Sequence, residues 1–117
     1  MEIYMKIAIV GSRKVKLTET DISEYVSEGD EIVSGGAVGV DSYAAKYALD
    51  YGHKLTEFLP RYELYGRSAP IVRNKEIVDY ADRVVVFWDG SSRGSLSVIK
   101  YAEKTGKPCK VIIRKPE

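Results

Sequence analysis

The sequence predicts an α/β domain in which a five-stranded parallel sheet is covered by helices on both faces. Apolar blocks of strand length alternate with stretches in which apolar residues recur at helical spacing, a pattern typical of β-α-β units. The block VVVFW at residues 84–88 is apolar at every position, as expected of a strand buried on both sides. Because 117 residues fit one such domain, we expect a single unit over residues 1–117.

The first half of the chain is predicted to contain three strands and two helices. Thr18 followed by Asp21 indicates an N-cap, and the helix that it opens is expected to end near Gly29. A stripe of small residues from Val40 to Ala48 predicts a second helix that packs closely on the sheet. All the predicted strands, in chain order, are residues 6–10, 31–34, 54–59, 83–88 and 109–113.

The second half is predicted to contain two further helices and one long connection. Pro70 is typical of a first helical turn, and Ile77 lies on the inward face of the helix that follows. The last helix is expected to end at Gly106, since Pro108 prevents its continuation. The connection at residues 60–69 is the longest in the chain, and connections of that length are often functional.

Composition excludes several classes of protein. Eighteen Lys and Arg against seventeen Asp and Glu give a net charge of +1, so the total charge indicates neither a nucleic-acid coat nor a membrane surface. One Cys and one His exclude an internal disulfide, a multi-thiolate zinc site and a His-rich metal centre, and no resident metal is predicted. No apolar run approaches the roughly 18 residues of a membrane span, so we expect a cytoplasmic protein.

The candidate functional residues gather where the predicted strands end. In an open parallel sheet ligands bind beyond the carboxyl ends of the strands, where glycines admit a phosphate and helix N-termini attract it. His53 and Cys109 fall at the opposite edge, and we expect structural roles for both. The candidate ligand-binding residues are Gly11, Ser12, Arg13, Ser34, Gly35, Gly36, Gly39, Asp41, Arg73, Asn74, Asp89, Gly90, Ser92, Gly94 and Ser95.

Two glycine-rich loops at matching strand-to-helix junctions favour a ligand site over plain tight turns. Neither loop matches the P-loop or the GxGxxG fingerprint, so ATPase and NAD-dehydrogenase activities are not supported. Tyr43, Tyr47 and Tyr51 recur at helical spacing, which is typical of an aromatic rim that closes the core and also of a homodimer surface.

Three segments together carry a family resemblance. Read in order, IAIVGSR, IVSGGAVGVD and RNKEIVDYADRVVVFWDGSSRGS resemble the SLOG superfamily, which joins the Smf/DprA and LOG families, and within it the small stand-alone YspA-like domains. The resemblance covers essentially the whole chain. It implies a Rossmann-like sheet of strand order 3-2-1-4-5 and a nucleotide or nucleotide-derived ligand lying across residues 11–13, 34–41, 73–74 and 89–95.

The chain departs from the LOG pattern at the position that matters for catalysis. LOG phosphoribohydrolases carry PGGxGTxxE with a catalytic glutamate, whereas residues 94–98 here read GSLSV and contain no acid. Asp41 and Asp89 are the remaining catalytic candidates, because a carboxylate at this edge could hold a ribose hydroxyl, a water or a Mg²⁺ ion that accompanies a phosphate. The alternatives are a first-turn helix acid for Asp41 and a turn-forming residue for Asp89.

Three functions follow, in decreasing order of support. The first is a module that binds or senses a nucleotide, a nucleotide sugar or a related phosphate compound. The second is an N-glycoside hydrolase that acts on a nucleoside monophosphate. The third is single-stranded DNA binding of the DprA type, for which residues 60–69 supply Arg61, Tyr62, Tyr65 and Arg67 but the near-zero net charge is unfavourable.

Overall fold

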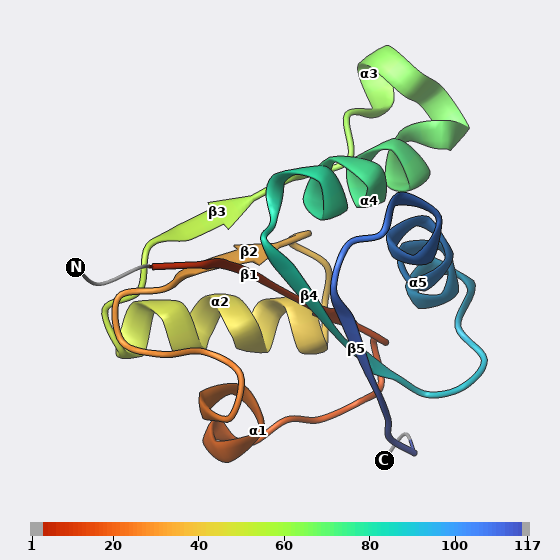
Figure 1. Ribbon diagram of the computed structural model, residues 1–117. Coiled ribbons are helices and arrows are strands. Elements are labelled where there is room, and N and C mark those ends of the chain that lie inside the picture. Colours follow the sequence, from red (N-terminus) through yellow and green to blue (C-terminus); the bar gives the residue numbers. More distant parts are fainter. Residues whose placement is uncertain (1–3, 116–117) are drawn as a thin grey trace.

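The computed structural model describes residues 4–115 and consists of one twisted sheet between two layers of helices (Figure 1). All strand pairs are parallel, and the order β3-β2-β1-β4-β5 confirms the predicted α/β class and the order 3-2-1-4-5 of a Rossmann-like domain. The strands are β1 (Lys6–Gly11), β2 (Glu31–Ser34), β3 (Leu55–Glu57), β4 (Arg83–Trp88) and β5 (Cys109–Ile113). Of these, β3 is shorter than predicted and β1 extends one residue further.

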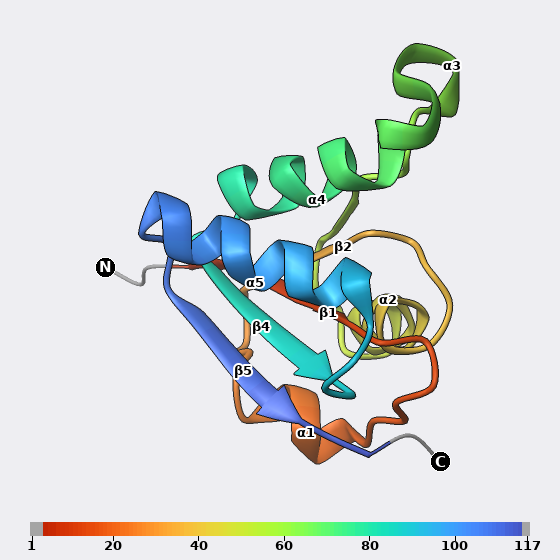
Figure 2. The ribbon, with the colours of Figure 1, turned by 90° about the vertical axis from the view of Figure 1, so that its right-hand side faces the viewer.

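The helices cover both faces, as predicted. Figures 1 and 2 show α1 and α2 on one side of the sheet and α4 and α5 on the other. The helical elements are α1 (Glu19–Ser23), α2 (Val40–Asp50), α3 (Tyr62–Tyr65), the 3₁₀ turn η1 (Gly66–Ser68), α4 (Ala69–Tyr80) and α5 (Arg93–Thr105). None of the helices within residues 4–115 has the length and apolar character needed to cross a membrane.

Alternating strand residues fill two separate cores. In β1, Ile7 and Ile9 pack with α1 and α2, whereas Ala8 and Val10 pack with α4 and α5. The same alternation in β4 explains the fully apolar VVVFW block, because its residues are shared between the two cores. Apolar side chains on both faces of the sheet are thus buried. Polar residues occur at the ends of the strands, where they are available to form the site.

The first helix is shorter than predicted. Its start is confirmed, since Thr18 and Asp21 form a reciprocal capping box. However, the helix ends at Ser23 rather than near Gly29, because the Asp30 carboxylate accepts a hydrogen bond from the Ser27 backbone N–H at 2.9 Å and turns the chain. The predicted end of the last helix at Gly106 is confirmed by its left-handed φ of 74°.

The long connection at residues 60–69 contains two short helical elements. It forms α3 and η1, which project from the body of the molecule in Figures 1 and 2. Tyr62 and Leu64 are 59% and 61% exposed, so this projection presents apolar side chains to solvent. Pro70 lies in the first turn of α4, as predicted.

The tyrosine stripe of α2 contributes to the core. Tyr47 is buried and packs with Tyr43 in the core on the α1 and α2 side, while Tyr51 remains half exposed. The His53 ring stacks on Tyr47 with 5.7 Å between centroids, and its Nδ1 lies 2.9 Å from the Asp30 carbonyl oxygen. These contacts are those of a structural histidine at the amino-end edge of the sheet.

Candidate functional site

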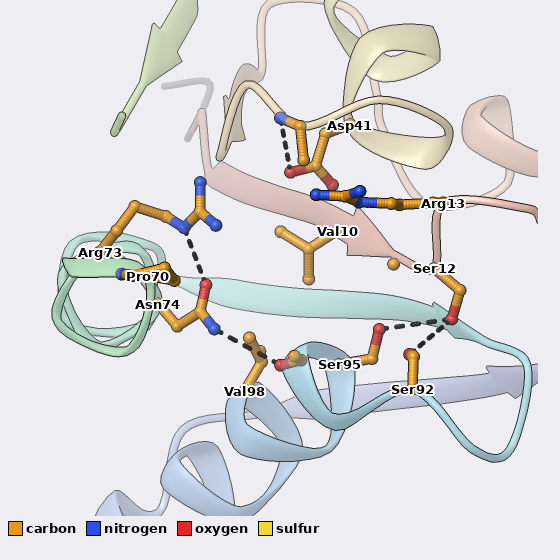
Figure 3. Close-up of a pocket in the computed structure, with 13 residues that line it drawn as sticks. Val10, Ser12, Arg13, Asp41, Pro70, Arg73, Asn74, Ser92, Ser95 and Val98 are labelled. Carbon is orange, nitrogen blue, oxygen red and sulfur yellow. Dashed lines mark hydrogen bonds between the residues drawn. The ribbon is translucent and has the colours of Figure 1, made fainter. Parts of the chain in front are cut away.

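A pocket of about 310 Å³ opens at the carboxyl edge of the sheet, between the end of β1 and the starts of α2, α4 and α5 (Figure 3). Nine of the candidate ligand-binding residues line it: Gly11, Ser12, Arg13, Asp41, Arg73, Asn74, Ser92, Gly94 and Ser95. They come from four chain segments, and the topology brings them together because parallel strands end at a common edge.

Serine hydroxyls join the end of β1 to the loop that follows β4. Ser12 Oγ lies 2.9 Å from Ser92 Oγ and 3.5 Å from Ser95 Oγ (Figure 3). It also accepts a hydrogen bond from the Asp89 backbone N–H at 3.1 Å. The side chain of Ser92, the N-cap residue of α5, makes no capping hydrogen bond to the first turn of that helix. The free N–H groups and the positive end of the helix dipole therefore face the pocket, where they favour an anion.

Arg73 and Asn74 link the second turn of α4 to the loop after β2 and to α5. The Arg73 guanidinium donates from Nη1 to the Gly35 carbonyl oxygen and from Nε to Asn74 Oδ1 at 2.9 Å. Asn74 Nδ2 in turn donates to Ser97 Oγ at 2.9 Å. Within residues 4–115 neither Arg73 nor Arg13 forms an ion pair, so both positive charges are available to a ligand.

Asp41 is the acidic residue of the pocket lining and lies in the first turn of α2. Its side chain is almost fully buried, and only one carboxylate oxygen has a partner: Oδ2 accepts from the Ala37 backbone N–H at 3.4 Å, whereas Oδ1 has none among the described residues. Burial raises the pKa of Asp41 to about 6, against the opposing effects of backbone N–H groups and the charge of Arg73. The carboxyl can therefore accept or donate a proton near neutral pH.

Gly35 and Gly39 shape the pocket from behind rather than line it. A Cβ on Gly35 would lie 2.8 Å from Asp41 Oδ2 and 2.9 Å from Arg73 Nη1, so a larger residue here would displace these two side chains. Gly39 has φ 83°, and its Cα lies against the backbone of Arg13 so closely that a Cβ would collide with it.

Four further candidates also lie outside the pocket lining: Ser34, Gly36, Asp89 and Gly90. The Ser34 hydroxyl donates to the Asp41 carbonyl oxygen at 3.2 Å and accepts from the Gly36 backbone N–H, so both residues brace the loop. Asp89 Oδ1 accepts from the backbone N–H groups of Ser91 and Ser92 at 2.9 and 2.8 Å, which lowers the pKa of Asp89. In the structure this carboxylate forms the turn that leads into α5.

Sequence reasoning missed the apolar wall of the pocket. Val10, Ala37, Pro70 and Val98 line it together with the polar residues. A signal for two of them was available, because Pro70 precedes Arg73 by three residues and Val98 follows Ser95 by three, which places each pair on one helix face. The wall makes the pocket amphipathic.

A known protein family matches this chain. The family model of DNA recombination-mediator protein A matches residues 2–61. The matched segment contains β1, β2, β3 and the two pocket loops that carry Arg13 and Asp41. No curated protein and no solved structure matches the chain.

Proposed function

Because this chain belongs to the DNA recombination-mediator protein A family, we propose that its pocket binds a nucleotide, a nucleotide sugar or another nucleotide-derived phosphate compound, as a binding or sensing module. One observation carries the proposal: Arg13 and Arg73, which form no ion pair within residues 4–115, and the start of α5 converge on one pocket. Cationic forks and free backbone N–H groups are the groups with which proteins hold phosphate.

The pocket also suits the remainder of such a ligand. Its volume of about 310 Å³ is at the lower end of the range for small-molecule sites. The phosphate contacts Gly94, Ser95 and the arginines, while Val10, Pro70 and Val98 pack against the sugar or base. The unpartnered Oδ1 of Asp41 accepts a hydrogen bond from a ribose hydroxyl or a base N–H.

A Mg²⁺ ion that accompanies the phosphate forms part of the proposal only as a companion of the ligand. Within the part of the chain that the structure describes, no group of three or more His, Cys, Asp or Glu residues could hold a metal ion. Asp41 supplies one carboxylate, and Mg²⁺ bound with a nucleotide takes most of its ligands from phosphate oxygens and water.

The decisive test places a negative charge at the start of α5. A Cβ on Gly94 meets nothing within 4 Å, and an acidic residue in a first helical turn stabilises the helix, so Gly94→Glu folds. We expect the panel nucleotide that binds best to lose at least tenfold in affinity by calorimetry and to lose its thermal stabilisation of the protein. Lys100→Gln is the matched control, since it removes one positive charge from the exposed side of the same helix. Equal affinity in both variants would reject the site.

Single-stranded DNA binding is a second candidate, supported by the family and by the projection formed by α3 and η1. Tyr62 and Tyr65 are 59% and 41% exposed, and the Arg61 guanidinium carbon lies 5.7 Å from the Tyr65 ring centre. Exposed aromatic rings beside arginines stack on unpaired bases. Fluorescence anisotropy with oligothymidylate tests it: Tyr62→Ala lowers the affinity if the projection binds DNA, and unchanged anisotropy rejects this candidate.

N-glycoside hydrolysis is a third candidate, and the position of Asp41 favours it. A buried carboxyl with a raised pKa inside a ligand pocket is typical of a general acid or base. In that reaction the protonated Asp41 gives its proton to the departing base as the C–N bond breaks. Water adds to the anomeric carbon, and the proton that it loses returns to the Asp41 carboxylate. Chromatography of a nucleoside monophosphate panel decides the matter, because release of free base that Asp41→Asn abolishes supports hydrolysis and no release rejects it.

A further inference from the structure

A second groove, of about 680 Å³, adjoins the pocket. It runs between the extended segment after β1 and the first half of α2, and Arg13 and Gly39 are among the residues that line it. Arg13 lines both hollows. The close contact of Gly39 with the Arg13 backbone fixes the boundary between them, so the two hollows keep a set spacing.

The groove has a cationic rim and one accessible aromatic ring. Along the extended segment, Val15 and Leu17 point into the protein, whereas Lys14 and Lys16 are exposed. The half-buried ring of Tyr43, from α2, lines the groove beside them.

The charges at this rim are unbalanced. Among residues 4–115, Arg13, Lys14 and Lys16 form no ion pair, and no acidic residue lines the groove. Lys46, which also lines it, pairs with Asp50 at 2.7 Å and contributes less. The groove therefore combines unpaired positive charges with the ring of Tyr43, against which another aromatic ring can stack.

We propose that this groove binds the second base and the linking phosphate of a two-nucleotide ligand whose first nucleotide occupies the pocket. The inference rests on the proposed function and names the ligand class of that site. The ring of Tyr43 takes the second base, and Lys14 and Lys16 face the linking phosphate. Arg13, which lines both hollows, lies where the two halves of the ligand join.

The first experiment compares 5′-phosphorylated dinucleotides with the matching mononucleotides, one pair for each base, by titration calorimetry on the full chain. The wild type binds the best dinucleotide at least tenfold more tightly than its mononucleotide. Lys14→Gln combined with Lys16→Gln reduces that advantage to less than threefold and leaves mononucleotide affinity within twofold of the wild type. The control, Lys100→Gln with Lys104→Gln, also removes two exposed charges but keeps the advantage.

Other results separate the two proposals. If mononucleotides and dinucleotides bind the wild type equally, or if the advantage survives in Lys14→Gln/Lys16→Gln, the second subsite is overturned while the pocket stands. If neither probe binds, the proposed function is overturned and the subsite with it.

A second variant tests the ring without removing charge. Tyr43→Leu keeps an apolar contact with the core and removes the aromatic face, and base stacking on such a ring changes affinity by roughly 5- to 160-fold. We expect the dinucleotide to lose at least fivefold and the mononucleotide to be unaffected. Tyr51→Leu, at the other end of the same helix, is the control and changes neither affinity. An unchanged dinucleotide affinity in Tyr43→Leu would show that no base lies in the groove.

Discussion

The two edges of the sheet contain aspartates that are equally buried and differently bonded. At the amino-end edge, Asp30 is 6% exposed, and its two oxygens accept from the backbone N–H groups of Met5 and Ser27, both at 2.9 Å. At the carboxyl edge, Asp41 is 5% exposed, yet its Oδ1 has no hydrogen-bond partner among the described residues. Burial alone therefore does not separate a structural acid from one available to a ligand, whereas unused hydrogen-bonding capacity does.

Breaking this contrast at Asp41 has the largest expected effect. Because burial raises the pKa of Asp41 to about 6, its contribution to stability is fully present below about pH 4 and is lost as the pH rises through 6. Asp41→Asn removes the cost of the buried charge and stabilises the protein by about 3 kcal/mol at pH 8, with little change at pH 4. Urea unfolding at both pH values measures it, and a gain that does not vary with pH would contradict the interpretation.

The reverse is expected at Asp30. Asp30→Ala leaves the N–H groups of Met5 and Ser27 without their acceptor and destabilises the protein by about 2 kcal/mol. Ligand affinity in the pocket stays unchanged, because Asp30 lies at the far edge. Denaturant unfolding and calorimetry on the same variant test both statements. If Asp30→Ala lowered ligand affinity as much as a pocket variant does, the assignment of a purely structural role to Asp30 would be wrong.

Ligand affinity can be compared between an arginine at each edge of the sheet, Arg73 at the carboxyl edge and Arg83 at the amino-end edge. Arg73→Gln removes a charged contact from the pocket and lowers nucleotide affinity about tenfold, which is about 1.4 kcal/mol. The matched control is Arg83→Gln, since Arg83 is exposed at the start of β4 on the amino-end edge. Calorimetry is expected to find the control within twofold of the wild type, and equal losses in the two variants would mean that only the net charge matters.

The smallest effect concerns a paired carboxylate, Asp21. The Arg114 guanidinium donates to its two oxygens at 2.6 and 3.2 Å and lowers the pKa of Asp21, opposite in direction to Asp41. This contribution is present above about pH 4 and is lost as the pH falls further, so Arg114→Gln costs about 0.5 kcal/mol at pH 7 and nothing near pH 2. Thermal unfolding at both pH values measures this difference. If Arg114→Gln destabilised the protein equally at pH 2, the loss would come from packing of the Arg114 side chain and not from its ion pair with Asp21.

Pattern reasoning predicts the fold from this sequence because strand blocks, caps and glycine loops are local. Val10 ends an apolar block, and Gly11 to Arg13 follow it, so the edge at which they lie is determined by topology alone. The partners of each polar group are not local. The turn made by Asp89, the ion pair of Arg61 with Glu76 at 3.1 Å and the unpartnered oxygen of Asp41 depend on distances between segments that no spacing rule contains.

The hydrogen bonds that Arg73 makes within the protein also affect the thermodynamics of anion binding in the pocket. Hydrogen bonds to Gly35 and Asn74 already hold the guanidinium in one orientation. A free arginine side chain loses about 2 kcal/mol of rotamer entropy when it is ordered, and here folding has already imposed most of that loss. Arg73 is thus preorganised for binding. We expect anion binding at this position to be favoured by enthalpy, with a small entropic penalty.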